Sequence, residues 1–188
     1  MKNALSNLST LDIFLSELNP SDYSEVKSKI ESTTATAMPL LSWDIFMDWF
    51  RQNALEHIKK VDRTAVLSFA KKFKWQNDLE STLATNDYEA IIITDKNQKI
   101  LWVNEGFTAM TGYAKKDALD NTPRFLQGEQ TSLQTKKRIK SKLALDKPFR
   151  EVIVNHRKDN STYKCEVKIF PLYNNGTTHY IALERKVG

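Results

Sequence analysis

The sequence predicts an α+β fold: a five-stranded antiparallel sheet with helices on one face, preceded by a helical N-terminal region. No glycine occurs among the first 105 of the 188 residues, and apolar residues recur there at helical spacing. Beyond residue 85 the pattern changes to short β-branched runs separated by polar turns. Residues 1–87 carry 10 basic and 12 acidic side chains, whereas residues 88–188 carry 18 and 11. We therefore expect a helical region over 1–84 and a second domain over 85–188.

The N-terminal region reads as about four helices. Leucine and aromatic residues at helical spacing predict helices over 11–18 and 20–30, and the small-residue stretch 32–37 reads as a connection. Ser42 is placed to cap an aromatic helix that runs to Val61. Asp62 is then expected to cap a last helix that extends to about residue 85.

The second domain reads as strand, strand, short helices, helix, and three more strands. Polar turns such as Lys96-Asn97-Gln98 join most of the strands, which favours antiparallel hairpins. Along 161–172, Tyr163, Cys165, Val167 and Ile169 alternate with charged residues, as in a half-buried strand. The predicted strands are 89–95, 99–104, 148–157, 161–172 and 178–186; the predicted helical segments are 105–113, 115–120 and 132–146. A cavity between such a sheet and its helices is a natural site for a small ligand.

Composition excludes several classes of site. A single cysteine allows neither an intramolecular disulfide nor a multi-cysteine zinc site, and the three histidines lack metal-ligand spacing. We predict no metal site. No phosphate-binding loop, nucleophile elbow or kinase signature occurs, so we expect no catalytic activity. Without a signal peptide or an apolar run of about 20 residues, we expect a cytoplasmic protein.

Three segments resemble the PAS domain family in order and spacing, and the resemblance covers about residues 84–187. They are ITDKNQKILWVNEGFTAMTGY (93–113), TPRFLQGEQTS (122–132) and NHRKDNSTYKCEVKIFPLYN (155–174). PAS domains are sensory and interaction modules. The five-stranded antiparallel sheet flanked by helices that the resemblance implies agrees with the strand pattern.

Within that family, RFLQG (124–128) and NHRKDNS (155–161) resemble the flavin-binding LOV branch. The resemblance implies that Arg124 and Gln127 lie where that branch contacts the flavin phosphate and ring, and Asn155 where it contacts the ring edge. The sequence departs from that branch at four places. Thr122 and Pro123 stand where it has an asparagine and the photoactive cysteine, and Cys165 and Glu184 stand where it has amides. Since proline carries no thiol, adduct chemistry is excluded at that position.

The resemblance implies a ligand pocket at the LOV-like positions, formed by Arg124, Gln127, Asn155, Cys165, Glu184, Ile153 and Val167. An ionised Glu184 accepts hydrogen bonds but does not donate them, so its burial without a partner is costly. We assign no cofactor, and non-covalent flavin stays open. Cys165 reads as an inert buried thiol or as a reactive one.

The predicted function is that of a non-catalytic sensory module that acts through a protein partner or as a homodimer, gated by a small ligand. One alternative is a non-covalent flavin receptor without adduct chemistry. A weaker one is nucleic-acid binding through the basic helix 132–146, which otherwise presents a solvated face. The aromatic side chains of the N-terminal helices either pack in a core or form an interaction face; the residues concerned are Trp43, Phe46, Trp49, Phe50, Phe69 and Phe73.

Overall fold

The computed structural model describes residues 43–188, with side chains from Met47 onward. The helices predicted over 11–18 and 20–30 and the connection at 32–37 lie outside the described residues. Residues 53–188 form one compact unit, and residues 43–52 belong to another. The helical elements are α3 (Trp43–Phe73), α4 (Leu79–Thr85), α5 (Glu105–Thr111), α6 (Lys115–Ala118), the 3₁₀ turn η2 (Pro123–Leu126) and α7 (Leu133–Leu143).

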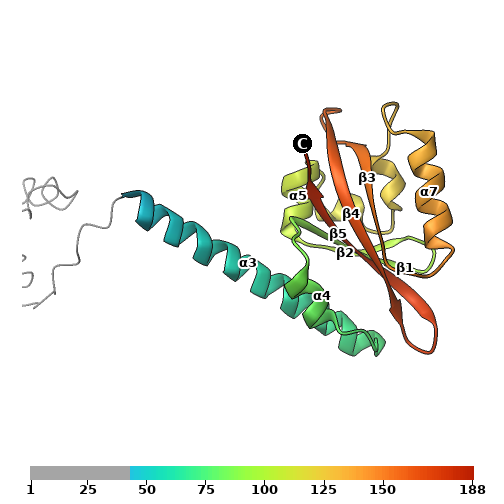
Figure 1. Ribbon diagram of the computed structural model, residues 1–188, viewed down its shortest axis with the longest axis horizontal. Helices are drawn as coiled ribbons and strands as arrows, with labels where there is room; N and C mark the ends of the chain where they lie inside the picture. Colours follow the sequence, from blue (N-terminus) through green and yellow to red (C-terminus); the bar gives the residue numbers. More distant parts are fainter. Residues whose placement is uncertain (1–42) are drawn as a thin grey trace, which may run out of the picture. The chain divides into compact units, whose positions relative to one another are not determined.

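The five strands form one antiparallel sheet in the order β2-β1-β5-β4-β3, which confirms the predicted fold (Figure 1). Their bounds are β1 (Ala90–Asp95), β2 (Ile100–Val103), β3 (Phe149–His156), β4 (Thr162–Tyr173) and β5 (Thr177–Lys186). The last strand in the sequence is thus the central strand of the sheet. It pairs with β1 on one side and with β4 on the other.

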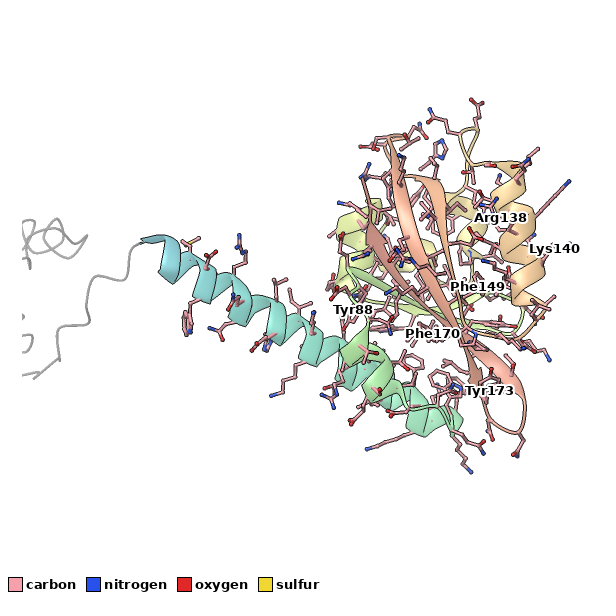
Figure 2. The ribbon with its side chains drawn as sticks, in the orientation of Figure 1. Tyr88, Arg138, Lys140, Phe149, Phe170 and Tyr173 are labelled. Atoms are coloured by element: carbon pink, nitrogen blue, oxygen red, sulfur yellow. The ribbon has the colours of Figure 1, made fainter. Side chains whose placement is uncertain are left out.

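The alternation of side chains along β5 divides the interior into two cores. Ala182 belongs to the core on the inner face, together with residues of α5, α6 and η2. Ile181 and Leu183 belong to the core on the other face, against the C-terminal half of α3. Tyr88 and Phe170 pack at the edge of this second core (Figure 2). Both faces of the central strand are therefore buried, because a hydrophobic core covers the sheet on each side.

Helix α3 differs from the prediction. The sequence placed a helix end near Val61 and a capping role on Asp62, and this is wrong because α3 runs without a break from Trp43 to Phe73. Asp62 lies inside it, with 4% of its surface exposed. Its Oδ2 accepts a hydrogen bond from Asn104 Nδ2 at 2.8 Å, so the carboxylate serves a tertiary contact instead of a helix end. Burial raises the pKa of Asp62, partly offset by that hydrogen bond.

Asn104 joins three elements through its side chain. Its Oδ1 accepts from the backbone N–H of Ile91 in β1 at 2.9 Å and from that of Phe107 in α5 at 3.0 Å. The second bond caps α5, and the bond to Asp62 ties both elements to α3. Because Asn104 is buried, the loss of this side chain would leave several polar groups without partners.

The C-terminal end of α3 is held to the sheet by an aromatic cluster. Phe73 stacks on Trp75 with ring centroids 5.5 Å apart, and Trp75 Nε1 donates to His179 Nδ1 of β5 at 3.2 Å. Burial lowers the pKa of His179, which keeps the imidazole neutral and its Nδ1 free to accept. Helix α4 begins separately, since Asp78 caps it by accepting from the N–H of Ser81 at 3.0 Å.

In the part of the chain that the structure describes, no helix combines the length and the apolar character that a membrane crossing requires.

We expect Gly106→Ala to destabilise the fold severely. A Cβ at this position would lie 1.7 Å from the carbonyl oxygen of Glu89, a backbone atom that no side-chain rotation relieves. Overpacking of this kind costs roughly 3 kcal/mol or more. Urea unfolding followed by circular dichroism measures the loss.

Glu105→Ala is the control for this substitution. It adds an alanine to the same helix but removes an exposed side chain, so we expect a change of less than about 1 kcal/mol. Equal stabilities for the two variants would show that the α5–β1 contact is not tight.

Candidate functional site

A cavity of about 370 Å³ is lined by residues of β1, β3, β4, β5, η2 and α7. This volume lies within the range of sites that accept drug-sized molecules. Its walls are mainly aliphatic and are formed by Ile92, Leu126, Leu133, Ile139, Leu143, Ile153, Val167, Ile169 and Ala182. A ligand that fills it would therefore have a largely apolar body.

The pleat of the sheet presents the lining residues on one face. Tyr180, Ala182 and Glu184 line the cavity at every second position of β5, and Ile153 and Asn155 do so on β3. Val167 of β4 pairs directly with Glu184. Two-residue periodicity is the reason that residues from three strands meet on this surface.

Six of the seven residues that the sequence singled out for a pocket line this cavity: Arg124, Gln127, Asn155, Glu184, Ile153 and Val167. Cys165 is not among the lining residues. It is buried in the inner core, behind Glu184.

The carboxyl group of Glu184 is the most unusual feature of the cavity. The residue is 5% exposed, and its Oε2 accepts a hydrogen bond from Cys165 Sγ at 3.6 Å. Burial raises the pKa of Glu184 to about 7, and the thiol hydrogen bond offsets only part of this effect. Burial also raises the pKa of the Cys165 thiol, as do the neighbouring carboxylates, so the thiol stays protonated. Cys165 is therefore not a thiolate nucleophile in this fold.

The segment after η2 is fixed against β3. Thr131 Oγ1 accepts from the N–H of Gly128 at 3.0 Å and donates to the carbonyl of Val154 at 2.6 Å. Gly128 also lies against the His156 ring so closely that a Cβ there would be 2.5 Å from the imidazole. These contacts fix the backbone next to Gln127, which lines the cavity as Asn155 does.

The basic side chains of α7 fall into two groups. Arg138 and Lys142 bind Glu151 of β3, with distances of 3.2 Å and 2.9 Å to its Oε1. These two cations lower the pKa of Glu151 through hydrogen bonds. The second group, Lys136, Lys137 and Lys140, lines the cavity, as does Arg124. Arg138 and Lys140, one residue of each group, are labelled on α7 in Figure 2.

The cavity lysines are residues that sequence reasoning missed, because it assigned the whole run to a solvated face. The signal that could have found them is their spacing. Lys140 lies four residues after Lys136 and three after Lys137, so the three share one side of a helix, whereas Arg138 and Lys142, four residues apart, share another. No residue among Arg124 and these three lysines has an ion-pair partner in the described part of the chain.

The predicted interaction face is divided in the structure. Phe69 and Phe73 pack in the core between α3 and the sheet. Trp49 and Phe50 are exposed, and the side chains of Trp43 and Phe46 lie outside the described ones. Within residues 53–188, α3 exposes three further large apolar side chains, Leu55, Ile58 and Val61. Over the residues described, no cluster of three or more histidine, cysteine or carboxylate side chains could hold a metal ion.

A family model described as a PAS domain matches residues 89–185, about half of the chain. The blue-light photoreceptor of Listeria monocytogenes is 33% identical over 101 residues, which are 52% of this chain and 40% of that protein. The nitrogen fixation regulatory protein of Klebsiella oxytoca is 30% identical over 100 residues, or 52% of this chain and 20% of that protein. Blue-light-activated histidine kinase 1 of Erythrobacter litoralis is 31% identical over 106 residues, covering 54% and 29% respectively. The chain thus spans less than half the length of these relatives.

Solved structures of LOV domains share the fold. The dark-state LOV domain of Aureochrome1 has a TM-score of 0.56 at 23% identity, over 60% of this chain and 85% of that one. A LOV domain studied with a flavin analogue has a TM-score of 0.54 at 27% identity, over 60% and 87%.

We expect Glu184→Gln to change how stability depends on pH. Because the pKa of Glu184 rises from 4.5 to about 7 on folding, its contribution to stability is full below about pH 4.5 and is lost as pH rises through 7. The wild-type chain should therefore lose roughly 2–3 kcal/mol relative to the variant between pH 4.5 and 8. Urea unfolding of both proteins at each pH measures this difference.

Glu105→Gln, which removes an exposed carboxylate, should follow the wild type at both pH values. A difference between wild type and Glu184→Gln that does not change with pH would contradict a buried carboxyl that ionises near neutrality.

Proposed function

The chain belongs to the PAS domain family, and from that premise we propose that it is a non-catalytic sensory module of signal transduction. A ligand in the cavity is its input, and contact with a second protein chain is its output. The relatives described above are named as photoreceptors, regulators and kinases, all of which are signalling proteins. The observation that carries the proposal is that β5 contributes to the ligand cavity on one face and to the α3 core on the other.

The link from input to output is physical. Ala182 and Glu184 line the cavity, and their neighbours Ile181 and Leu183 pack in the core that contains Val66 of α3. A ligand that displaces β5 at the cavity therefore also moves the side chains of β5 that pack against α3. Such a link fits a switch in which a close-packed element has two arrangements.

The output surface is the exposed face of α3. Ala54, Ile58 and Val61 follow one another at intervals of four and three residues and therefore share a side of the helix. Ile58 is 48% and Val61 55% exposed, although both are apolar. Glu56 and Lys60 are exposed nearby with opposite charges. A surface with an apolar stripe and both signs of charge is complementary to itself, so the partner we propose is a second copy of this chain.

We expect the double substitution Ile58→Glu with Val61→Glu to abolish self-association. Two carboxylates in the stripe would face their counterparts in a dimer and would be costly to bury. Sedimentation equilibrium of the full chain should give a concentration-dependent mass for the wild type and a monomer mass for the variant.

Lys71→Glu is a matched control, because it changes the net charge by the same two units as the double substitution. Lys71 is exposed in the last turn of the same helix, away from the stripe and from Glu56 and Lys60, and we expect this variant to associate as the wild type does. A wild-type chain that remains monomeric at millimolar concentration would contradict the dimer.

A second candidate is a receptor that binds flavin without forming an adduct. Gln127 and Asn155 offer amides to the polar edge of a ring, aliphatic side chains face its planes, and Arg124 lies where an anionic tail would leave the cavity. These groups fit a flavin if Glu184 is protonated and donates, which its raised pKa permits near neutrality. Flavin would supply absorption of blue light. Pro123 lines the cavity and Cys165 does not, so no thiol meets the ligand.

Absorbance spectroscopy tests this candidate. A chain that binds flavin should show visible absorption bands after purification, or should quench the fluorescence of added riboflavin 5′-phosphate. Blue light should then leave those bands without the bleaching that thiol addition causes. Asn155→Ala should weaken binding about tenfold, since it removes a buried hydrogen-bonding group. A colourless chain that takes up no riboflavin 5′-phosphate would contradict the flavin candidate.

A further inference from the structure

The cavity contains a buried carboxyl group whose oxygens can accept further hydrogen bonds. Glu184 is more than nine-tenths buried and lines the cavity. Its Oε2 receives the Cys165 thiol at 3.6 Å, a long and weak hydrogen bond. In residues 53–188 no cation and no other hydrogen-bond donor reaches the carboxyl group. A buried carboxylate needs donors, and the cavity that Glu184 lines has room for a ligand that supplies them.

A carboxylate has two acceptor oxygens in one plane. Two adjacent N–H groups on a planar molecule satisfy both, as in the bidentate pairs that carboxylates form with guanidinium groups. Asn155 of β3 lines the same cavity and can donate its amide N–H to a carbonyl. Together, Glu184 and Asn155 are complementary to a ring edge with two neighbouring N–H donors followed by a carbonyl oxygen.

The remaining lining fits the rest of such a molecule. Ile153, Val167 and Ala182 form an aliphatic floor on the sheet, suited to the face of a planar ring. Arg124 and Lys140 are exposed at the cavity and have no carboxylate partner in the described part of the chain. Their charges favour an anionic group on the outer part of the ligand.

We propose that the cavity binds a planar heterocycle with a 2-amino-4-oxopyrimidine edge, which faces Glu184 and Asn155, and an anionic tail, which faces the basic side chains of η2 and α7. This edge is shared by guanine nucleotides and pterins. The inference rests on the proposed sensory function, because it names the class of ligand that the cavity senses.

The pattern of donors and acceptors on the ring edge distinguishes this class of ligand from adenine nucleotides and flavins. Adenine has no adjacent pair of N–H donors beside a carbonyl, so its edge leaves a carboxylate oxygen unpaired. A flavin edge has one N–H between two carbonyl oxygens, so it pairs one oxygen of an ionised Glu184 and sets a carbonyl oxygen against the other. A site with a buried acceptor rejects ligands that lack the matching donor, because the acceptor then stays unpaired.

Calorimetric titration of the full chain at pH 8 tests the inference. Guanosine 5′-monophosphate should bind at least about tenfold more tightly than adenosine 5′-monophosphate, which has the same sugar and phosphate. Pterin-6-carboxylate, titrated in parallel, distinguishes the two sources of the edge, and tight binding of either one supports the inference. Binding of neither guanosine 5′-monophosphate nor pterin-6-carboxylate, or equal affinities for the two nucleotides without tight binding of pterin-6-carboxylate, would overturn it.

Two variants localise the effect. In Glu184→Gln, the dissociation constants of the two nucleotides should lie within about twofold of each other. Glu105→Gln, outside the cavity, should keep the preference for guanosine 5′-monophosphate. Lys140→Gln should weaken the binding of both nucleotides by the same factor, because Lys140 acts on the phosphate that they share. A guanine preference that survives in Glu184→Gln would overturn the assignment of that residue.

Failure of this inference differs from failure of the proposed function. Binding of riboflavin 5′-phosphate without binding of guanosine 5′-monophosphate or pterin-6-carboxylate would overturn the ligand class and leave a ligand-gated module. The self-association of α3, measured without any ligand, tests the output separately.

Discussion

The strict alternation of side chains along β5 is the constraint on which the rest of the structure depends. The strand is central and is covered on both faces, so each residue has a fixed core: Ile181 and Leu183 on the side of α3, Ala182 and Glu184 on the side of the cavity. A slip of one residue would exchange the two sets and place a carboxyl group in the α3 core. The apolar residues of β5 therefore fix where Glu184 stands, even though that position is unfavourable for a charge.

Two buried glutamates on neighbouring strands illustrate how partners decide the role of a carboxyl group. Glu166 of β4 is 1% exposed but binds Arg150 and Arg185. Burial alone would raise the pKa of Glu166; the two guanidinium groups outweigh that effect and lower it. Glu184 has no cation in residues 53–188, and its pKa is raised. The first carboxylate is held in two structural ion pairs, and the second lines the cavity without one in those residues.

The polar contacts beside the two cores connect α3 to the sheet. Asn104 binds Asp62 of α3 and the backbones of β1 and α5, and Trp75 binds His179 of β5. Both contacts are buried, so separation of α3 from the sheet would leave unpaired polar groups as well as exposed aromatic rings. The C-terminal half of α3 is thus an integral part of the domain, and its exposed stripe is attached to the strand that lines the cavity.

The sequence by itself determined the five strands to within one or two residues and the inward set Tyr163, Cys165, Val167 and Ile169, because two-residue periodicity is a local property. It did not determine the role of Asp62, because an aspartate before an apolar stripe is typical of a capping residue and its true partner lies 42 residues away along the chain. Nor did it divide the lysines of α7 between Glu151 and the cavity, or separate Cys165 from the lining. Those outcomes were decided only by tertiary structure, since packing brings together residues whose spacing in the sequence carries no signal.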